Sequence, residues 1–433
     1  MPEPERHDSS PAVGHDRPVG EDGTRALGVI LRAATLLHAN GQSTGMTLLA
    51  AQRLSRGLGQ PAVVLPGWGA VTVYDPGRGG AQAITAAAQP TGVNMRRVAA
   101  LMRVIDEAEH RGVRPEELEP ALAAAERLPI SGTPAFALAC AAGAGALAVI
   151  FGAGDPLVVA VVATVAGIGG VLRRVVARLG AGVLGQAFGA ALLAGIAGAV
   201  AAHLGHAAAI GLIAVCPAMV LVPGPQVLVG AMDLLALRIP LALARLAFSA
   251  LVLATIAAGL VLGLALGGQT LPLSSPATDV PLWADVLAAG VAAACYPVFF
   301  AMPYRLLGWP IVVGMAAHAV HWAAIACGHA GLPVAALASC LLVGAVLTPI
   351  AYRFHIPFAA IGFASVVALV PGMYVFRMVA GLIALSTAPD QQLLLDVAVD
   401  GVTAGAIVAC MAIGLALPTR VRDGILERRM RAT

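Results

Sequence analysis

The sequence predicts a polytopic α-helical membrane protein that carries a small N-terminal domain of helices and strands. Its 433 residues are 59% hydrophobic and 11% charged, with a mean hydropathy of +0.87, whereas soluble domains carry about 25% charged residues. Charge density also drops near Pro134, since residues 1–133 hold 13 of the 26 arginines and long apolar runs follow. Two of those runs contain the motif Leu-Val-Pro-Gly.

The N-terminal region is predicted to be cytoplasmic. Residues 1–24 are polar at their start and predicted to be disordered, and they contain no apolar segment that would form a cleavable signal peptide. Residues 25–133 are predicted to form an α/β or α+β domain. Its predicted helices span residues 25–39, 45–57, 93–109 and 115–127, and its strands residues 62–65, 70–74 and 81–88, with a turn over residues 75–80.

The loop Gly41-Gln42-Ser43-Thr44-Gly45 is not predicted to bind phosphate, because it lacks the lysine and the preceding strand of a phosphate loop. Ser43 or Thr44 is predicted to cap the next helix. Nothing in the domain suggests a catalytic triad, so we predict neither an enzyme nor a cofactor. The net charge of +3 is too small to predict a nucleic-acid partner.

Ten apolar runs are long enough, or nearly so, to cross about 30 Å of hydrocarbon as helices. They cover residues 134–153, 156–172, 180–202, 207–236, 241–266, 284–302, 310–327, 332–351, 356–385 and 392–417. Among the connections between these runs, only alternate ones contain arginine, and more arginines follow the last run: Arg173, Arg174, Arg178, Arg238, Arg305, Arg353, Arg420, Arg422, Arg428, Arg429 and Arg431. This asymmetry predicts a multi-pass membrane protein with both termini in the cytoplasm.

The two Leu-Val-Pro-Gly motifs predict an internal repeat. Leu221 lies 87 residues after residue 134, and Leu369 lies 85 residues after residue 284. Residues 134–266 and 284–418 are therefore predicted to be two five-helix repeats, joined by an external linker over 267–283 and followed by a basic cytoplasmic tail over 419–433. Because five is odd, the second repeat would be inverted, and helices broken near mid-membrane are typical of a transporter's substrate site.

The chain resembles the threonine/serine exporter family over nearly its whole length. The resemblance is carried by the segments at 36–44, 54–59, 93–98 and 115–118, and by the two Val-Pro-Gly regions at 219–233 and 367–377. It implies proton-driven export of small amino acids across the bacterial inner membrane. Family members usually have a glutamate near position 48, where this chain has Leu48.

The residue types at the breaks suggest how a zwitterionic substrate would bind. The substrate carboxylate is predicted to bind at the two breaks, to the amides exposed around Pro223, Gly224, Pro371 and Gly372. Arg377 is predicted to bind the same carboxylate. Asp233 would take the ammonium group. Asp233 and Asp400 are the candidate proton-coupling residues, because ionisable residues inside a membrane are usually functional.

Other polar residues receive weaker predictions. His318 and His321 share a helix face but lack a third ligand, so helix packing or proton relay is favoured over a metal. The expected partners are threonine or serine, protons and the lipid bilayer, and the oligomeric state is left open. Two alternatives stand beside amino-acid export: export of dicarboxylates, which some split-chain relatives handle, and a membrane sensor or scaffold that transports nothing.

Overall fold

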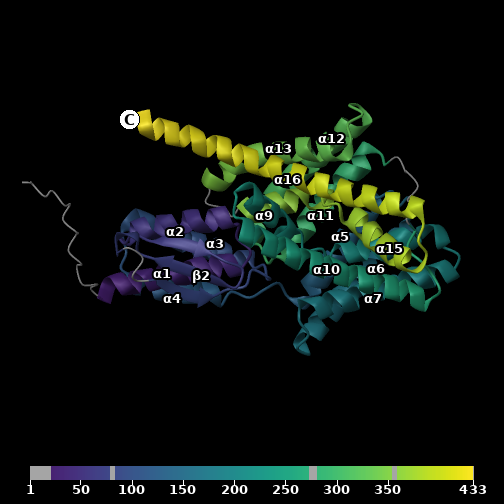
Figure 1. Ribbon diagram of the computed structural model, residues 1–433, viewed down its shortest axis with the longest axis horizontal. Helices are drawn as coiled ribbons and strands as arrows, with labels where there is room; N and C mark the ends of the chain where they lie inside the picture. The colour runs from purple at the N-terminus through teal and green to yellow at the C-terminus, as the bar shows by residue number, and fades with distance from the viewer. Residues whose placement is uncertain (1–20, 79–82, 273–279, 354–357, 433) are drawn as a thin grey trace, which may run out of the picture.

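The computed structural model describes residues 21–78, 83–272, 280–353 and 358–432. Figure 1 shows the N-terminal domain at one end of a long helical bundle, with the C-terminal part of α16 (Gln391–Ala432) extending at the same end. Parts of the predicted disordered start, of the turn over residues 75–80 and of the external linker lie outside the described residues.

The N-terminal domain packs four helices with one three-stranded sheet. These elements are α1 (Glu21–Ala39), α2 (Thr44–Gly57), β1 (Val63–Pro66), β2 (Ala70–Tyr74), η1 (Pro76–Arg78), β3 (Ala83–Ala87), α3 (Met95–Arg111) and α4 (Pro115–Glu126). The strands are antiparallel in the order β1-β2-β3, with Val63 opposite Tyr74 and Ala70 opposite Ala87. A sheet of consecutive antiparallel strands with separate helices is the α+β arrangement.

Local sequence explains these elements. In α1, Leu27, Ile30 and Leu37 recur at helical spacing and are all buried, so this helix presents one apolar face to the sheet and to the other helices. The helix α3 begins after Asn94, whose side chain accepts the Arg97 amide N–H, and it ends at Gly112, whose φ of 59° suits glycine.

Within the described residues, eight single helices are long and apolar enough to cross a bilayer. They are α5 (Thr133–Ile150), α6 (Pro156–Arg178), α7 (Val183–His203), α10 (Ile239–Leu266), α11 (Leu282–Phe299), α12 (Gly308–Ala326), α13 (Leu332–Arg353) and α16. Two bent pairs bring the number to as many as ten if each pair is one span: α8 (Ile210–Met219) with α9 (Gly224–Leu235), and α14 (Phe358–Val366) with α15 (Gly372–Thr387). The bends are 68° and 53°, so each over-long predicted run consists of two helices joined at a sharp break and not of one straight helix. Short turns η2 (Ala207–Ala209), η3 (Tyr304–Leu306) and η4 (Val367–Leu369) complete this part.

The last predicted span and the predicted basic tail form one continuous helix, α16, of 42 residues. The helix passes Pro418 without ending. Arginine and leucine are good helix formers, so the polar segment can extend the membrane helix beyond the apolar region.

Glycines let the membrane helices approach closely, which is how helices associate where no hydrophobic driving force exists between them. A Cβ on Gly195 of α7 would lie 2.3 Å from the Leu260 carbonyl oxygen of α10. A Cβ on Gly263 of α10 would lie 2.4 Å from the Leu192 carbonyl oxygen of α7. These two helices therefore cross with their backbones in contact.

Replacing Gly195 by leucine should lower the thermal stability and yield of the detergent-purified protein. The new side chain would collide with backbone that cannot swing aside, and overpacking costs about 1–3 kcal/mol or more. The matched control is Gly189→Leu on the same helix, where a Cβ would meet nothing within 4 Å. Equal melting temperatures for the two variants would contradict the close crossing.

The two halves of the membrane region share one pattern of neighbours. The helix α7 packs on α10 as α13 packs on α16, and α9 packs on α10 as α15 packs on α16. The helix α5 packs on α6 as α11 packs on α12. The halves meet where α5 packs on α11 and where each broken pair contacts the other.

Candidate functional site

Both Leu-Val-Pro-Gly motifs form the same turn. In the first, the Gly224 N–H donates to the Val222 carbonyl at 2.8 Å, and Pro223 has φ −77° and ψ 54°. In the second, the Gly372 N–H donates to the Val370 carbonyl at 2.8 Å, with φ −79° and ψ 47° at the intervening proline. These are inverse γ-turns, in which proline supplies the fixed φ.

The amide groups of the first break are largely used within the turn. Gly224 N–H bonds Val222, the Gln226 and Val227 N–H groups both bond the Pro223 carbonyl, and Pro225 has no N–H. The expectation that exposed amides at this break would hold a carboxylate therefore needs correction. What the break offers is the positive end of the α9 dipole and carbonyl oxygens.

The two turns line one buried cavity between the broken helices. The lining residues are Leu147, Met219, Val222, Gly224, Tyr296, Phe363, Val367, Val370 and Gly372. The two glycines make reciprocal contacts, because each faces the first half of the other broken pair. A Cβ on Gly224 would lie 2.4 Å from the Phe363 ring of α14, and one on Gly372 would lie 3.2 Å from Met219 of α8.

Phe363 separates this cavity from a second one. It lines the central cavity and also a pocket between the membrane helices and the N-terminal domain, to which the domain contributes Gly41, Ser43, Val93 and Met95. The Phe363 ring packs against Tyr296 at 5.7 Å and against Phe300 at 5.9 Å between ring centroids. Aromatic side chains therefore close the central cavity on the side of the N-terminal domain.

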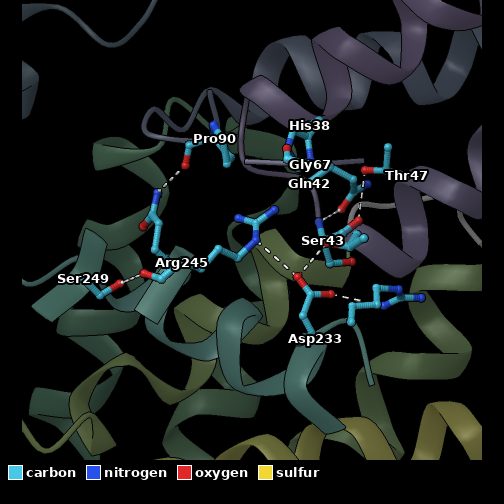
Figure 2. Close-up of polar contacts among 12 residues, drawn as sticks. His38, Gln42, Ser43, Thr47, Gly67, Pro90, Asp233, Arg245 and Ser249 are labelled. Carbon is cyan, nitrogen blue, oxygen red and sulfur yellow. Dashed lines mark hydrogen bonds and ion pairs between the residues drawn. The ribbon is translucent and has the colours of Figure 1, made fainter. Parts of the chain in front are cut away.

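A buried carboxylate lies where the N-terminal domain meets the membrane helices. Asp233, in the last turn of α9, is 2% exposed and accepts a 2.8 Å hydrogen bond from Thr44 Oγ1 at the start of α2. Arg238 Nη1 donates to its other oxygen at 3.1 Å, and Arg245 Nε of α10 lies 3.2 Å from the oxygen that Thr44 binds. Figure 2 shows Asp233 and Arg245 pointing toward one another beside the loop that carries Ser43.

The N-terminal domain adds further polar groups to this junction. His38 is fully buried, and its Nε2 lies 3.0 Å from the Gly67 carbonyl oxygen. Burial first, and then the Arg245 charge, lower the pKa of His38 to about 4, so its ring is neutral at neutral pH. Gln226 of α9 donates to the Pro90 carbonyl at 3.3 Å. Polar contacts thus join the domain to the first and the last turn of α9 (Figure 2).

A second acid–arginine pair lies between α15 and α16. Arg377 Nε donates to Asp400 Oδ2 at 3.1 Å, and Arg377 Nη2 lies 3.0 Å from Oδ1, so the pair is bidentate. The Asp400 side chain is 6% exposed and the Arg377 side chain 22% exposed. The guanidinium carbon also lies 5.7 Å from the centre of the Tyr374 ring.

The structure brings together some of the predicted site residues. The turns containing Pro223 and Gly224 and those containing Pro371 and Gly372 share one cavity. Asp233 and Arg377 instead have separate partners, Arg238 and Arg245 for the first and Asp400 for the second. Each repeat-like half therefore contains its own acid–arginine pair.

Several residues of these sites were missed or misread from the sequence. Arg245 lies within a predicted span, where a buried arginine is itself a signal. Ser43 occupies the predicted N-cap position of α2, but its side chain makes no capping hydrogen bond. The Thr44 hydroxyl donates to Asp233. Asp285 of α11 pairs with His318, 33 residues away, which no local pattern indicates. Among the described residues, no group of three His, Cys, Asp or Glu side chains could hold a metal ion.

The fold and these sites define a class of protein: a polytopic helical membrane protein in which two broken helices meet at an internal cavity. Residues 28–267 match the family model of the threonine/serine exporter ThrE, and residues 285–421 match a second model described as threonine/serine exporter, ThrE. The chain belongs to the threonine/serine exporter family. The two models divide the chain at the predicted linker between the halves. No curated protein and no solved structure matches this chain.

Proposed function

We propose that this protein exports threonine, serine and similarly small amino acids across the bacterial inner membrane, driven by the proton motive force. The observation that carries the proposal is the shared cavity at the two Val-Pro-Gly turns, because non-helical backbone at membrane depth is tolerated only where it faces protein or a cavity. Its lining is mostly apolar.

We further propose that residues 134–266 and 284–418 are inverted repeats that alternate between inward-open and outward-open arrangements. The matching packing of helices in both halves and the identical turns 148 residues apart support this. The arginine-bearing connections support an orientation with the N-terminal domain and both termini in the cytoplasm. Two of these connections contact that domain. Arg238 and Thr44 of the domain both donate hydrogen bonds to Asp233. Tyr304, which precedes Arg305, packs its ring against the guanidinium of Arg96 in the domain.

The acid–arginine pairs match the charges of a zwitterion. A substrate can replace the internal ion pair if its carboxylate binds Arg377 and its ammonium group binds Asp400. The same replacement can occur at Arg245 and Asp233, nearer the cytoplasm. The N-terminus of α15, which begins at Gly372, adds a positive dipole toward the carboxylate. A carboxylate that binds a proton can no longer bind the ammonium group. Competition of this kind between proton and substrate is what an antiporter requires.

Transport by the purified protein in proteoliposomes tests this function. Vesicles loaded with unlabelled threonine should accumulate external labelled threonine by counterflow, and serine should compete. A dicarboxylate should not compete, because Asp233 and Asp400 would repel its second charge. Competition by succinate alone would favour the dicarboxylate alternative, and the absence of any solute movement would favour the sensor or scaffold alternative.

A further inference from the structure

We propose that Asp285 and His318 form a proton-binding site on α11 and α12, additional to Asp233 and Asp400, with His321 on its route to the surface. This inference rests on the proposed function, since it supplies a site for the proton that drives export. His318 Nδ1 lies 3.1 Å from Asp285 Oδ2, and the two residues are 2% and 7% exposed.

The chemistry of this pair differs from that of the acid–arginine pairs. An aspartate beside an arginine is neutral as a pair without binding a proton. An aspartate beside a neutral imidazole carries one net negative charge, and the pair becomes neutral only by taking up one proton. Because an isolated charge is costly in a membrane interior, the pair has a physical reason to bind a proton there.

One nitrogen of the pair faces no protein partner. His318 Nε2 is buried without a hydrogen-bond partner among the described residues. The His321 ring, three residues further along α12, is half-buried, and the two ring centroids lie 6.1 Å apart. That separation is too long for a direct hydrogen bond, so a proton that moves between the two rings would need a water molecule to bridge them.

The surroundings contribute few other charges. The ionisable groups that act on His321 are His318 and Asp285. The helix α14 has no titratable side chain, and α13 contributes Ser339, whose hydroxyl donates to the Ala317 carbonyl at 2.9 Å. Protonation of this site is therefore governed by the acid–imidazole pair itself.

The other half of the molecule shows that this pair is not needed to hold the helices together. The 148-residue offset between the two motifs relates Asp285 to Ala137 and His318 to Gly170. A Cβ on Gly170 would lie 3.3 Å from the Ala137 Cα, so these equivalents are also neighbours. In the first half, α5 and α6 contact each other through two small residues, Ala137 and Gly170. In the second half, the contact between α11 and α12 contains a buried acid and an imidazole at the equivalent positions.

The pair is also connected to the central cavity. Gly314 lies one turn before His318 on α12, and a Cβ there would lie 3.2 Å from the Ser365 carbonyl oxygen of α14. The same short helix α14 carries Phe363, which lines the central cavity. A change of charge at His318 can therefore shift the contact between α12 and α14 next to the site of substrate binding.

Proteoliposome transport separates this role from a structural one. Asp285→Asn and His318→Gln should retain threonine counterflow within about twofold of wild type. They should lose accumulation of threonine driven by an imposed pH gradient by roughly tenfold or more, as expected when a charged hydrogen bond is removed. His203→Gln is the control, because His203 lies at the end of α7 and its Nε2 lies 2.9 Å from the Gly267 carbonyl oxygen, away from α11 and α12.

Wild-type proton-driven accumulation in both variants would overturn the proposal. If the wild-type protein shows no threonine counterflow, the proposed function itself is refuted. Should the variants not fold, nitrogen NMR of histidine-labelled wild-type protein in lipid keeps the proposal testable. His318 should change between neutral and charged imidazole as pH falls, and a His318 signal that stays neutral throughout would refute the site.

Discussion

Replacing Gly224 by alanine should lower threonine export by roughly tenfold or more while the protein still reaches the membrane. The added Cβ would lie 2.4 Å from the Phe363 ring, which is held between Tyr296 and Phe300. The backbone itself accepts alanine, because Gly224 lies in the first turn of α9 and is not among the positive-φ glycines. The loss would therefore report on the contact between the two broken helices and not on helix formation.

Two further variants make this result specific. Gly211→Ala lies on α8 of the same broken pair, where a Cβ meets nothing within 4 Å, and it should export at the wild-type rate. Adding Phe363→Leu to Gly224→Ala removes the colliding ring and should restore part of the export. If Gly224→Ala exports normally, the close contact between the first break and α14 has no role in transport.

The second large effect is expected at the acid–arginine pair of α15 and α16. Arg377→Met and Asp400→Asn should each remain folded and lose threonine export by roughly tenfold to a hundredfold, the range for removing hydrogen bonds to charged groups. Arg377→Lys should also be impaired, because lysine cannot reproduce the bidentate geometry. Threonine counterflow measures the transport activity of each purified variant, and its melting temperature measures whether it is folded.

The controls distinguish substrate binding from structural neutralisation. Asp396→Asn removes an exposed acid one turn earlier on α16 and should change little. If Arg377 and Asp400 only neutralise each other, each single variant leaves an unpaired buried charge and the double variant should recover folding and export. If they bind substrate, the double variant should fold and stay inactive. Recovery of export in the double variant would remove this pair from the substrate site.

The chain alone determined the class and the broad organisation of this protein. Apolar runs of about 20 residues are typical of membrane helices, so composition and length were sufficient to predict a polytopic helical protein, in which the described residues contain eight candidate spans, or as many as ten with the two bent pairs. Proline and glycine act locally on the backbone, so the breaks at Pro223 and Pro371 were also predictable. The strands and helices of the N-terminal domain were predictable from the spacing of apolar residues and from the residues at the turns. Choosing α+β over α/β required the strand order, which the structure supplies.

Only the tertiary structure decided which charges pair. Asp233 was visible as an intramembrane acid, but its partners are Thr44, 189 positions earlier, and Arg245 on the next helix. Arg377 and Asp400 were both singled out from the sequence, yet nothing local placed them on facing helices. The physical reason is that side-chain pairs across helices depend on the rotation of each helix about its axis, which packing sets. Periodicity indicates which face of a helix is apolar, but it does not say which residue of a neighbouring helix that face meets.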